Sequence, residues 1–134
     1  MSAADVFHDT NVILYLLSAD SARADRAEEV LAAGGHISVQ VLNEFAAVAS
    51  RKLSLTWLEI GEFLEHVRAV CTVEAITVQT HERGLVLASR YGLHVYDAMI
   101  VASALLSGCS VLHSEDLQHG QVFDRQLTVH NPFR

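Results

Sequence analysis

The chain has 134 residues, of which 51% are apolar, with a single proline and a formal net charge of −7. This length and composition predict one folded domain with its own core and exclude a disordered chain, which would lack apolar residues to bury. The acidic balance argues against a protein that wraps nucleic acid through a broad basic face, although bound cations can reverse the sign of charge locally.

The two cysteines, Cys71 and Cys109, are far apart in the chain and form no CxxC pair. We expect both to be small core residues of a reduced, cytoplasmic protein. The N-terminus has no basic stretch followed by a long apolar region, so no signal peptide is expected. The longest apolar run, 98–112, is too short to span a bilayer and is interrupted by serines and a glycine.

The chain alternates between short β-prone runs and longer segments with helical spacing of apolar residues. Strands are expected at 6–8, 36–38, 72–76, 110–113 and 126–130. Helices are expected at 12–17, 22–33, 39–52, 55–70, 80–91 and 96–106. Ser54 is expected to cap the fourth helix, and 114–124 to be a loop with at most a short helical turn. This alternation predicts a parallel sheet covered by helices on both faces.

In such sheets, binding sites lie beyond the carboxyl ends of the strands. Asp9 directly follows the first expected strand, and Asp116 lies three residues beyond the fourth. Glu44 lies within about two turns of the start of its helix, and Asp97 opens a helix that is apolar almost all round. Unpaired carboxylates beside apolar runs are costly, and crowded ones repel each other. We therefore expect these four acids to converge around divalent metal.

Each acid also has an ordinary structural explanation. Asp9 is a favourable helix cap, and Asp97 suits the first turn of its helix, where it would also serve as a cap. Glu44 can lie on a solvated helix face, and Asp116 sits in a turn rich in Ser and acidic residues. Glu115, the neighbour of Asp116, could replace it or assist it. The ordered set of four is therefore more specific than any single member.

Four short acidic motifs carry a family resemblance: Asp9-Thr10-Asn11-Val12, Asn43-Glu44, Asp97-Ala98 and Ser114-Glu115-Asp116. In order, spacing and flanking residues they resemble the motifs of PIN (PilT N-terminus) domains, and especially the VapC-type toxins of toxin–antitoxin operons. The segments Asp116-Leu117-Gln118-His119-Gly120 and Asn131-Pro132-Phe133 are similar to one subset of those toxins. The resemblance covers essentially the whole chain.

The resemblance implies a three-layer α/β/α sandwich with a central parallel sheet in strand order 3-2-1-4-5. It also implies a metal-dependent endoribonuclease whose partners are RNA, a cognate VapB-type antitoxin and a second copy of the chain. Asp9, Asp97 and Asp116 would then bind Mg²⁺ or Mn²⁺, and Glu44 would hold a second ion or orient the attacking water. Hydrogen bonds that aim these carboxylates would come from Thr10, Asn11 and Ser114.

Beyond the four acids, the sequence gives weaker indications of which residues contact RNA or a partner protein. Candidate contacts to the RNA backbone are Arg23, Arg26, Arg51, Lys52 and Arg90, and His119 is a candidate assistant to the site. The helices 22–33 and 55–70 would form an arm that offers apolar residues to a partner: Trp57, Leu58, Ile60 and Phe63. For each of these residues an ordinary solvated or core role is the alternative.

Two other functions fit parts of the same pattern. A phosphatase or phospho-receiver with a nucleophilic aspartate also places Asp after the first strand, but it needs a lysine near a later strand. The only lysine here is Lys52, which is far from that place. A catalytically weak or silent PIN-like module that only binds protein or RNA is the second alternative.

Overall fold

The computed structural model describes residues 2–134, which fold around one six-stranded sheet in the order β3-β2-β1-β4-β6-β5. The strands are β1 (Val6–His8), β2 (His36–Ser38), β3 (Thr72–Glu74), β4 (Val111–His113), β5 (Val122–Phe123) and β6 (Leu127–His130). Every neighbouring pair is parallel except β5 and β6, which are antiparallel.

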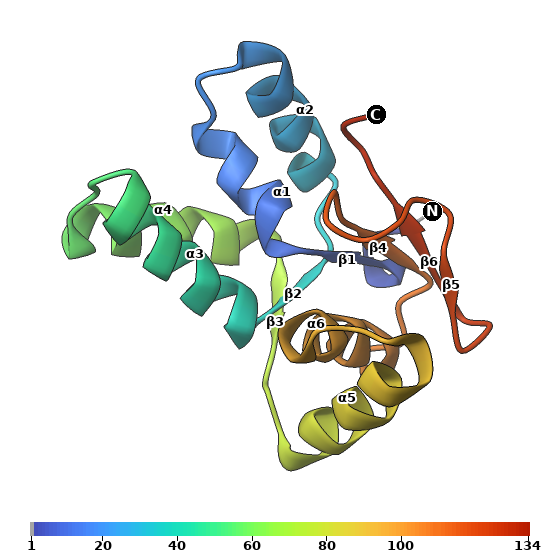
Figure 1. Cartoon of the computed structure of the whole chain (residues 1–134). Coiled ribbons are helices and arrows are strands. Elements are labelled where there is room, and N and C mark those ends of the chain that lie inside the picture. The colour runs from blue at the N-terminus through green and yellow to red at the C-terminus, as the bar shows by residue number, and fades with distance from the viewer. Residues whose placement is uncertain (1) are drawn as a thin grey trace.

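The helices lie in layers on both sides of this sheet, so the expected α/β/α sandwich is confirmed (Figure 1). They are α1 (Thr10–Leu14), α2 (Ser21–Ala32), α3 (Val39–Lys52), α4 (Trp57–Val70), α5 (Val78–Tyr91) and α6 (Val95–Leu106). Two short 3₁₀ helices are η1 (Ala3–Asp5) and η2 (Tyr15–Leu17). In Figure 1, α5 and α6 lie on one side of the sheet and α1 and α2 on the other, while the α3–α4 pair extends from the β2–β3 edge.

The expected strand order 3-2-1-4-5 is confirmed for the five parallel strands, but the sheet has one strand more than expected. The sixth is β5, a two-residue strand inside the stretch expected to be a loop, and it pairs with β6 through a tight hairpin. Asp124 and Arg125 form the turn with φ values of 49° and 56°. Their left-handed backbone matches the tight hairpin turns that suit strand twist. The local sequence lacks the Asn-Gly or Asp-Gly pair that usually marks such turns.

Two expected helix starts are also wrong. Helix α4 is capped by Thr56, whose side chain accepts a hydrogen bond from the Glu59 amide in a reciprocal capping box, and not by Ser54. Helix α6 has His94 at its N-cap position, so Asp97 lies in the first turn and is not the cap.

The core lies between the sheet and the helices, and α6 runs through its centre with eight consecutive buried residues, Ala98–Leu105. Both cysteines are buried and free, as expected. Within the described part of the chain, no helix is long and apolar enough to cross a membrane.

Candidate active site

Asp9 and Ser114 lie side by side because β1 and β4 are paired in register. His8 is opposite His113, and the next residue on each strand therefore projects to the same side of the sheet. The Ser114 hydroxyl donates a 2.8 Å hydrogen bond to Asp9 Oδ2, and the Thr10 amide donates one of 2.7 Å to Oδ1. Asp9 is 5% exposed. It is thus both the cap of α1 and a buried carboxylate at the carboxyl edge of the sheet.

The surroundings of Asp9 make its charged form costly. Burial raises the pKa of Asp9 to about 7, against hydrogen bonds from Ser114 and Thr10 that favour the carboxylate. The negative charges of Asp116 and Glu44 raise the pKa of Asp9 further. Acids from three distant segments of the chain therefore interact at this point.

Glu44 reaches the site from α3, which begins directly after β2. Its Oε1 accepts hydrogen bonds from the Thr10 hydroxyl at 3.0 Å and from Gln40 Nε2 at 3.1 Å. Gln40 Nε2 also donates to the carbonyl of Tyr96 at 2.9 Å. Because Tyr96 immediately precedes Asp97, Gln40 ties the helix that carries Glu44 to the start of the helix that carries Asp97.

Asp97 and Asp116 complete the acidic group. Burial raises the pKa of Asp97, and the negative charge of Asp116 raises it further, while His94 lowers it. The backbone amide of Asp116 donates to Ser114 Oγ at 3.2 Å, and its side chain is exposed. The carboxylate of Asp116 therefore raises the pKa of both Asp9 and Asp97. Ser114 Oγ connects Asp116 to Asp9 through hydrogen bonds.

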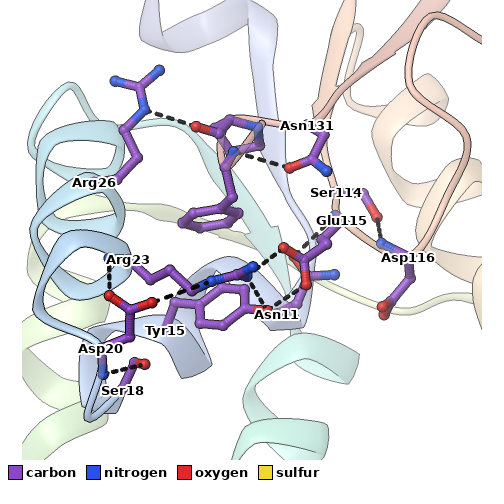
Figure 2. Close-up of polar contacts among 12 residues, drawn as sticks. Asn11, Tyr15, Ser18, Asp20, Arg23, Arg26, Ser114, Glu115, Asp116 and Asn131 are labelled. Carbon is purple, nitrogen blue, oxygen red and sulfur yellow. Dashed lines mark hydrogen bonds and ion pairs between the residues drawn. The ribbon is translucent and has the colours of Figure 1, made fainter.

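The carboxylate of the neighbouring acid, Glu115, points toward Arg23 and Tyr15 (Figure 2). Its Oε2 accepts a 2.7 Å hydrogen bond from Arg23 Nη1, and its Oε1 accepts one from the Tyr15 hydroxyl. Only its backbone faces the site: the Glu115 amide donates to Asn11 Oδ1 at 3.2 Å, and Asn11 Nδ2 lies 3.4 Å from Asp9 Oδ2. Within residues 2–134, the Glu115 carboxylate has hydrogen-bond partners and the Asp116 carboxylate has none.

The donor set fits a hard divalent cation. It consists of carboxylates, which suit Mg²⁺ and Mn²⁺. Burial is the largest cause of the raised pKa of Asp9, and the negative charges of Asp116 and Glu44 add to it. Among residues 2–134, no three His, Cys, Asp or Glu side chains are already gathered as tightly as ligands around an ion.

Sequence reasoning missed Gln40 and Ser38. Gln40 lies one helical turn before Glu44, and an i, i+4 amide–carboxylate pair is the signal that would have found it. Ser38 ends β2, and its fully buried hydroxyl has no hydrogen-bond partner within residues 2–134. Phe7 on β1 pairs with His36 on β2, so the residues two positions further along each strand, Asp9 and Ser38, lie side by side on the same face of the sheet.

A hollow of about 640 Å³ opens next to Glu44. Residues of α3, α5 and α6 line it, including Gln40, Asn43, His81 and Tyr96. Glu44 is the acid of the site that lines this hollow.

The basic candidates are mostly engaged elsewhere. Arg23 pairs with Glu115, Arg26 with Glu29 at 2.8 Å, and Arg90 with Asp124 at 2.6 Å. Arg51 and Lys52 are exposed at the end of α3.

His119 lies in a row of histidines that crosses strand ends. Its ring is 5.2 Å from that of His130, which is 5.5 Å from His113, and His113 Nδ1 is 3.2 Å from His8 Nδ1. The side chains of His8 and His113 alternate with those of Asp9 and Ser114, so this row belongs to the opposite face of the sheet. His119 is therefore placed away from the acids, contrary to its expected role as an assistant.

The fold and the acidic group place this chain among α/β/α proteins whose carboxylates gather where parallel strands end. The family model of the PIN domain matches residues 6–123, and the chain belongs to the PIN domain family. The resemblance found in the four motifs is thereby confirmed. No curated protein sequence matches the chain significantly.

Solved structures with a similar fold include a toxin–antitoxin complex from Klebsiella pneumoniae, with 21% identity and a TM-score of 0.72 over 95% of this chain and 97% of that one. Another is VapC20 of Mycobacterium tuberculosis, a toxin that cleaves the sarcin–ricin loop, with 21% identity and a TM-score of 0.68 over 83% of this chain and 89% of that one. At this identity, the likenesses show a common fold.

Proposed function

We propose that this chain is an Mg²⁺- or Mn²⁺-dependent endoribonuclease and the toxin component of a VapBC-type toxin–antitoxin module. Support comes from its PIN domain family and from similar structures described as a toxin–antitoxin complex and a cleaving toxin. The observation that carries the proposal is Asp9, a buried carboxylate whose pKa is raised to about 7 by burial and by acids of other segments. A buried carboxylate of this kind destabilises the fold when no ligand balances its charge, and groups with strongly shifted pKa values are concentrated at functional sites.

In this proposal Asp9, Asp97 and Asp116 hold the cation. The chemistry supplied with a bound divalent ion is activation of water near neutral pH and neutralisation of charge on the phosphate. Glu44 accepts both of its hydrogen bonds at Oε1, which fixes the carboxylate and leaves Oε2 to orient the attacking water or to hold a second ion. Ser114, Thr10 and Asn11 aim the Asp9 carboxylate through the hydrogen bonds described above.

The reaction is hydrolysis of an RNA phosphodiester without a nucleophilic side chain. In-line attack by water leaves a 5′-phosphate and a 3′-hydroxyl. The hollow beside Glu44 offers space for the nucleotides that flank the scissile bond. Since Arg23, Arg26 and Arg90 are held in ion pairs, RNA affinity should depend more on the cation and on shape than on a basic surface.

The partners in this proposal are an antitoxin and a second copy of the chain, in the cytoplasm. Apolar surface for a partner comes from Trp57 and Leu58 at the start of α4, which are 72% and 74% exposed. Ile60 is only 3% exposed, and Phe63 stacks on Phe45 with ring centroids 5.0 Å apart, so these two serve the core of the chain itself. Light scattering behind a sizing column would report a dimer that Trp57→Ser weakens.

The decisive experiment compares wild type, Asp9→Asn and Asp97→Asn on structured RNAs with Mg²⁺, with Mn²⁺ and with EDTA. The exposed Asp25→Asn on α2 is the matched control, because it removes the same charge away from the site. We expect metal-dependent cleavage by wild type and control, and at least 100-fold less by the two site variants. Cleavage that persists in EDTA or in Asp9→Asn would refute the assignment, and metal binding without cleavage would favour a silent binding module.

A further inference from the structure

Tyr15, Arg23 and Glu115 form a compact group beside the acidic site, here called the Arg23 cluster (Figure 2). Arg23 Nη1 donates to Tyr15 Oη at 2.6 Å and to Glu115 Oε2 at 2.7 Å, and the Tyr15 hydroxyl donates to Glu115 Oε1. The guanidinium also lies over the Tyr15 ring, 4.9 Å from its centroid. Charged hydrogen bonds of this kind are among the stronger ones in proteins.

The Arg23 cluster joins three separate segments: η2, α2 and the loop that follows β4. Burial raises the pKa of Tyr15, and the hydrogen bond to the Glu115 carboxylate raises it further, so the phenol remains a donor at neutral pH. The Tyr15 ring also packs edge-to-face with the Phe133 ring, with ring centroids 4.5 Å apart. Of the two groups that hold Glu115, Tyr15 is thus fixed by packing and Arg23 by its contacts with Tyr15.

The loop around Glu115 carries the residues that face the acidic site. Ser114 donates to Asp9, Asp116 follows with its amide on Ser114 Oγ, and the Glu115 amide is fixed by Asn11. The charge of Asp116 is repelled by the neighbouring acids, which would push an unanchored loop outward. The ion pair of Glu115 with Arg23 opposes this movement from the other side of the loop.

We propose that Glu115 is a positioning residue that does not bind the cation: Arg23 and Tyr15 hold its carboxylate, and the loop so fixed directs Asp116 toward Asp9 and Asp97. This inference rests on the proposed metal-dependent function. It predicts that Arg23, Tyr15 and Glu115 act as one unit on metal affinity, because removing any one of them loosens the same loop.

The test is Mn²⁺ binding by calorimetry, together with kcat and the Mn²⁺ concentration for half-maximal RNA cleavage. The variants are Arg23→Met, Tyr15→Phe, Glu115→Gln and the double variant Arg23→Met/Glu115→Gln. Asp116→Asn is the reference for loss of a ligand, and Glu29→Gln is the control, because it breaks an exposed ion pair of the same helix. Tyr15→Phe keeps the ring and its packing, so it tests the hydroxyl alone in a chain that folds.

Each single variant should weaken Mn²⁺ binding by about 10-fold, as removal of groups that orient metal ligands does, and kcat at saturating Mn²⁺ should change little. The double variant should bind Mn²⁺ no more weakly than the more weakly binding of its two single variants, since both changes break the same contact. Asp116→Asn should lose more affinity than any of them, and Glu29→Gln should match wild type.

Weak binding by Glu115→Gln alone, with normal binding by Arg23→Met and Tyr15→Phe, would make Glu115 a metal ligand and overturn the inference. Unchanged Mn²⁺ affinity in all three single variants would reduce the Arg23 cluster to a purely structural role. If wild type itself bound no Mn²⁺, the proposed function and this inference would fall together. If wild type bound and cleaved normally while the variants matched it, only the inference would fail.

Discussion

Asp9→Asn should stabilise the metal-free protein while it abolishes cleavage. The pKa of Asp9 rises from an ordinary 3.8 to about 7 in the fold, chiefly through burial. At about 1.4 kcal/mol per pKa unit, the ionised carboxylate costs the folded state roughly 4 kcal/mol above pH 7. Asparagine keeps the acceptor for the Thr10 amide, but the Ser114 hydroxyl has to turn. The expected net gain is therefore smaller, about 1–3 kcal/mol at pH 8.

The size of this effect depends on pH. In the unfolded chain Asp9 ionises above about pH 4, whereas in the fold it stays protonated until about pH 7. Its contribution to stability is therefore full below pH 4 and is lost as the pH rises to 7. Urea unfolding followed by circular dichroism in EDTA should show a clear gain for Asp9→Asn at pH 8 and almost none at pH 4.

Asp124→Asn is the matched control, because its effect should have the opposite sign. Burial acts to raise the pKa of Asp124, but hydrogen bonds from Arg83, Tyr91 and Arg90 outweigh it and leave the pKa lowered. The amide variant loses those charged contacts and should be less stable at pH 8. An Asp9→Asn protein no more stable than wild type at pH 8, or equally stabilised at pH 4, would refute the assignment of Asp9 as a costly buried carboxylate.

Three further outcomes follow from the packing around the sheet. Burial, and then neighbouring His8, lower the pKa of His113 to about 3. As the pH falls below 6.5, this group should therefore lower the free energy of unfolding of wild type by up to about 1.4 kcal/mol per pH unit. His113→Gln should flatten that slope in urea titrations, and an unchanged slope would contradict the buried, uncharged state of His113. Ser38→Ala removes a buried hydroxyl that has no hydrogen-bond partner among residues 2–134, and it should raise stability by up to about 1 kcal/mol, whereas a clear loss would show that the hydroxyl is paired in solution. Gly35→Ala adds a methyl group 2.6 Å from His8 Nε2 at a φ of +130°, so thermal unfolding should report a loss of about 2 kcal/mol or more, and near-neutral behaviour would contradict the close approach.

The alternation of apolar patterns predicted the parallel sheet and its helices because both depend on local periodicity. Helix α3 begins and ends where the spacing of Val41 and Phe45 places it. The short strand β5 was missed because two residues carry no period, and pairing with β6 depends on a turn of unusual sequence. Leu58 lies on the spacing of a buried helix face, yet it is 74% exposed, whereas Ile60 two residues later is 3% exposed.

The acids themselves could be found from the ends of strands and helices, but their surroundings could not. Glu115 and Asp116 are adjacent, and their different directions depend on Arg23 and Tyr15, which are 92 and 100 residues away from Glu115 in sequence. The sequence predicts Asp9 both as a helix cap and as a site residue, and its side chain caps α1. Its raised pKa depends on burial and on Asp116 and Glu44, and none of these effects is visible in sequence alone.

The central claim is that carboxylates from four distant segments share a divalent cation. Crystals soaked in Mn²⁺ would test it directly through anomalous scattering. We predict a peak bounded by Asp9, Asp97 and Asp116, with Glu44 close by and the Glu115 carboxylate still on Arg23. A peak elsewhere, or none at a Mn²⁺ concentration that supports cleavage, would contradict the account.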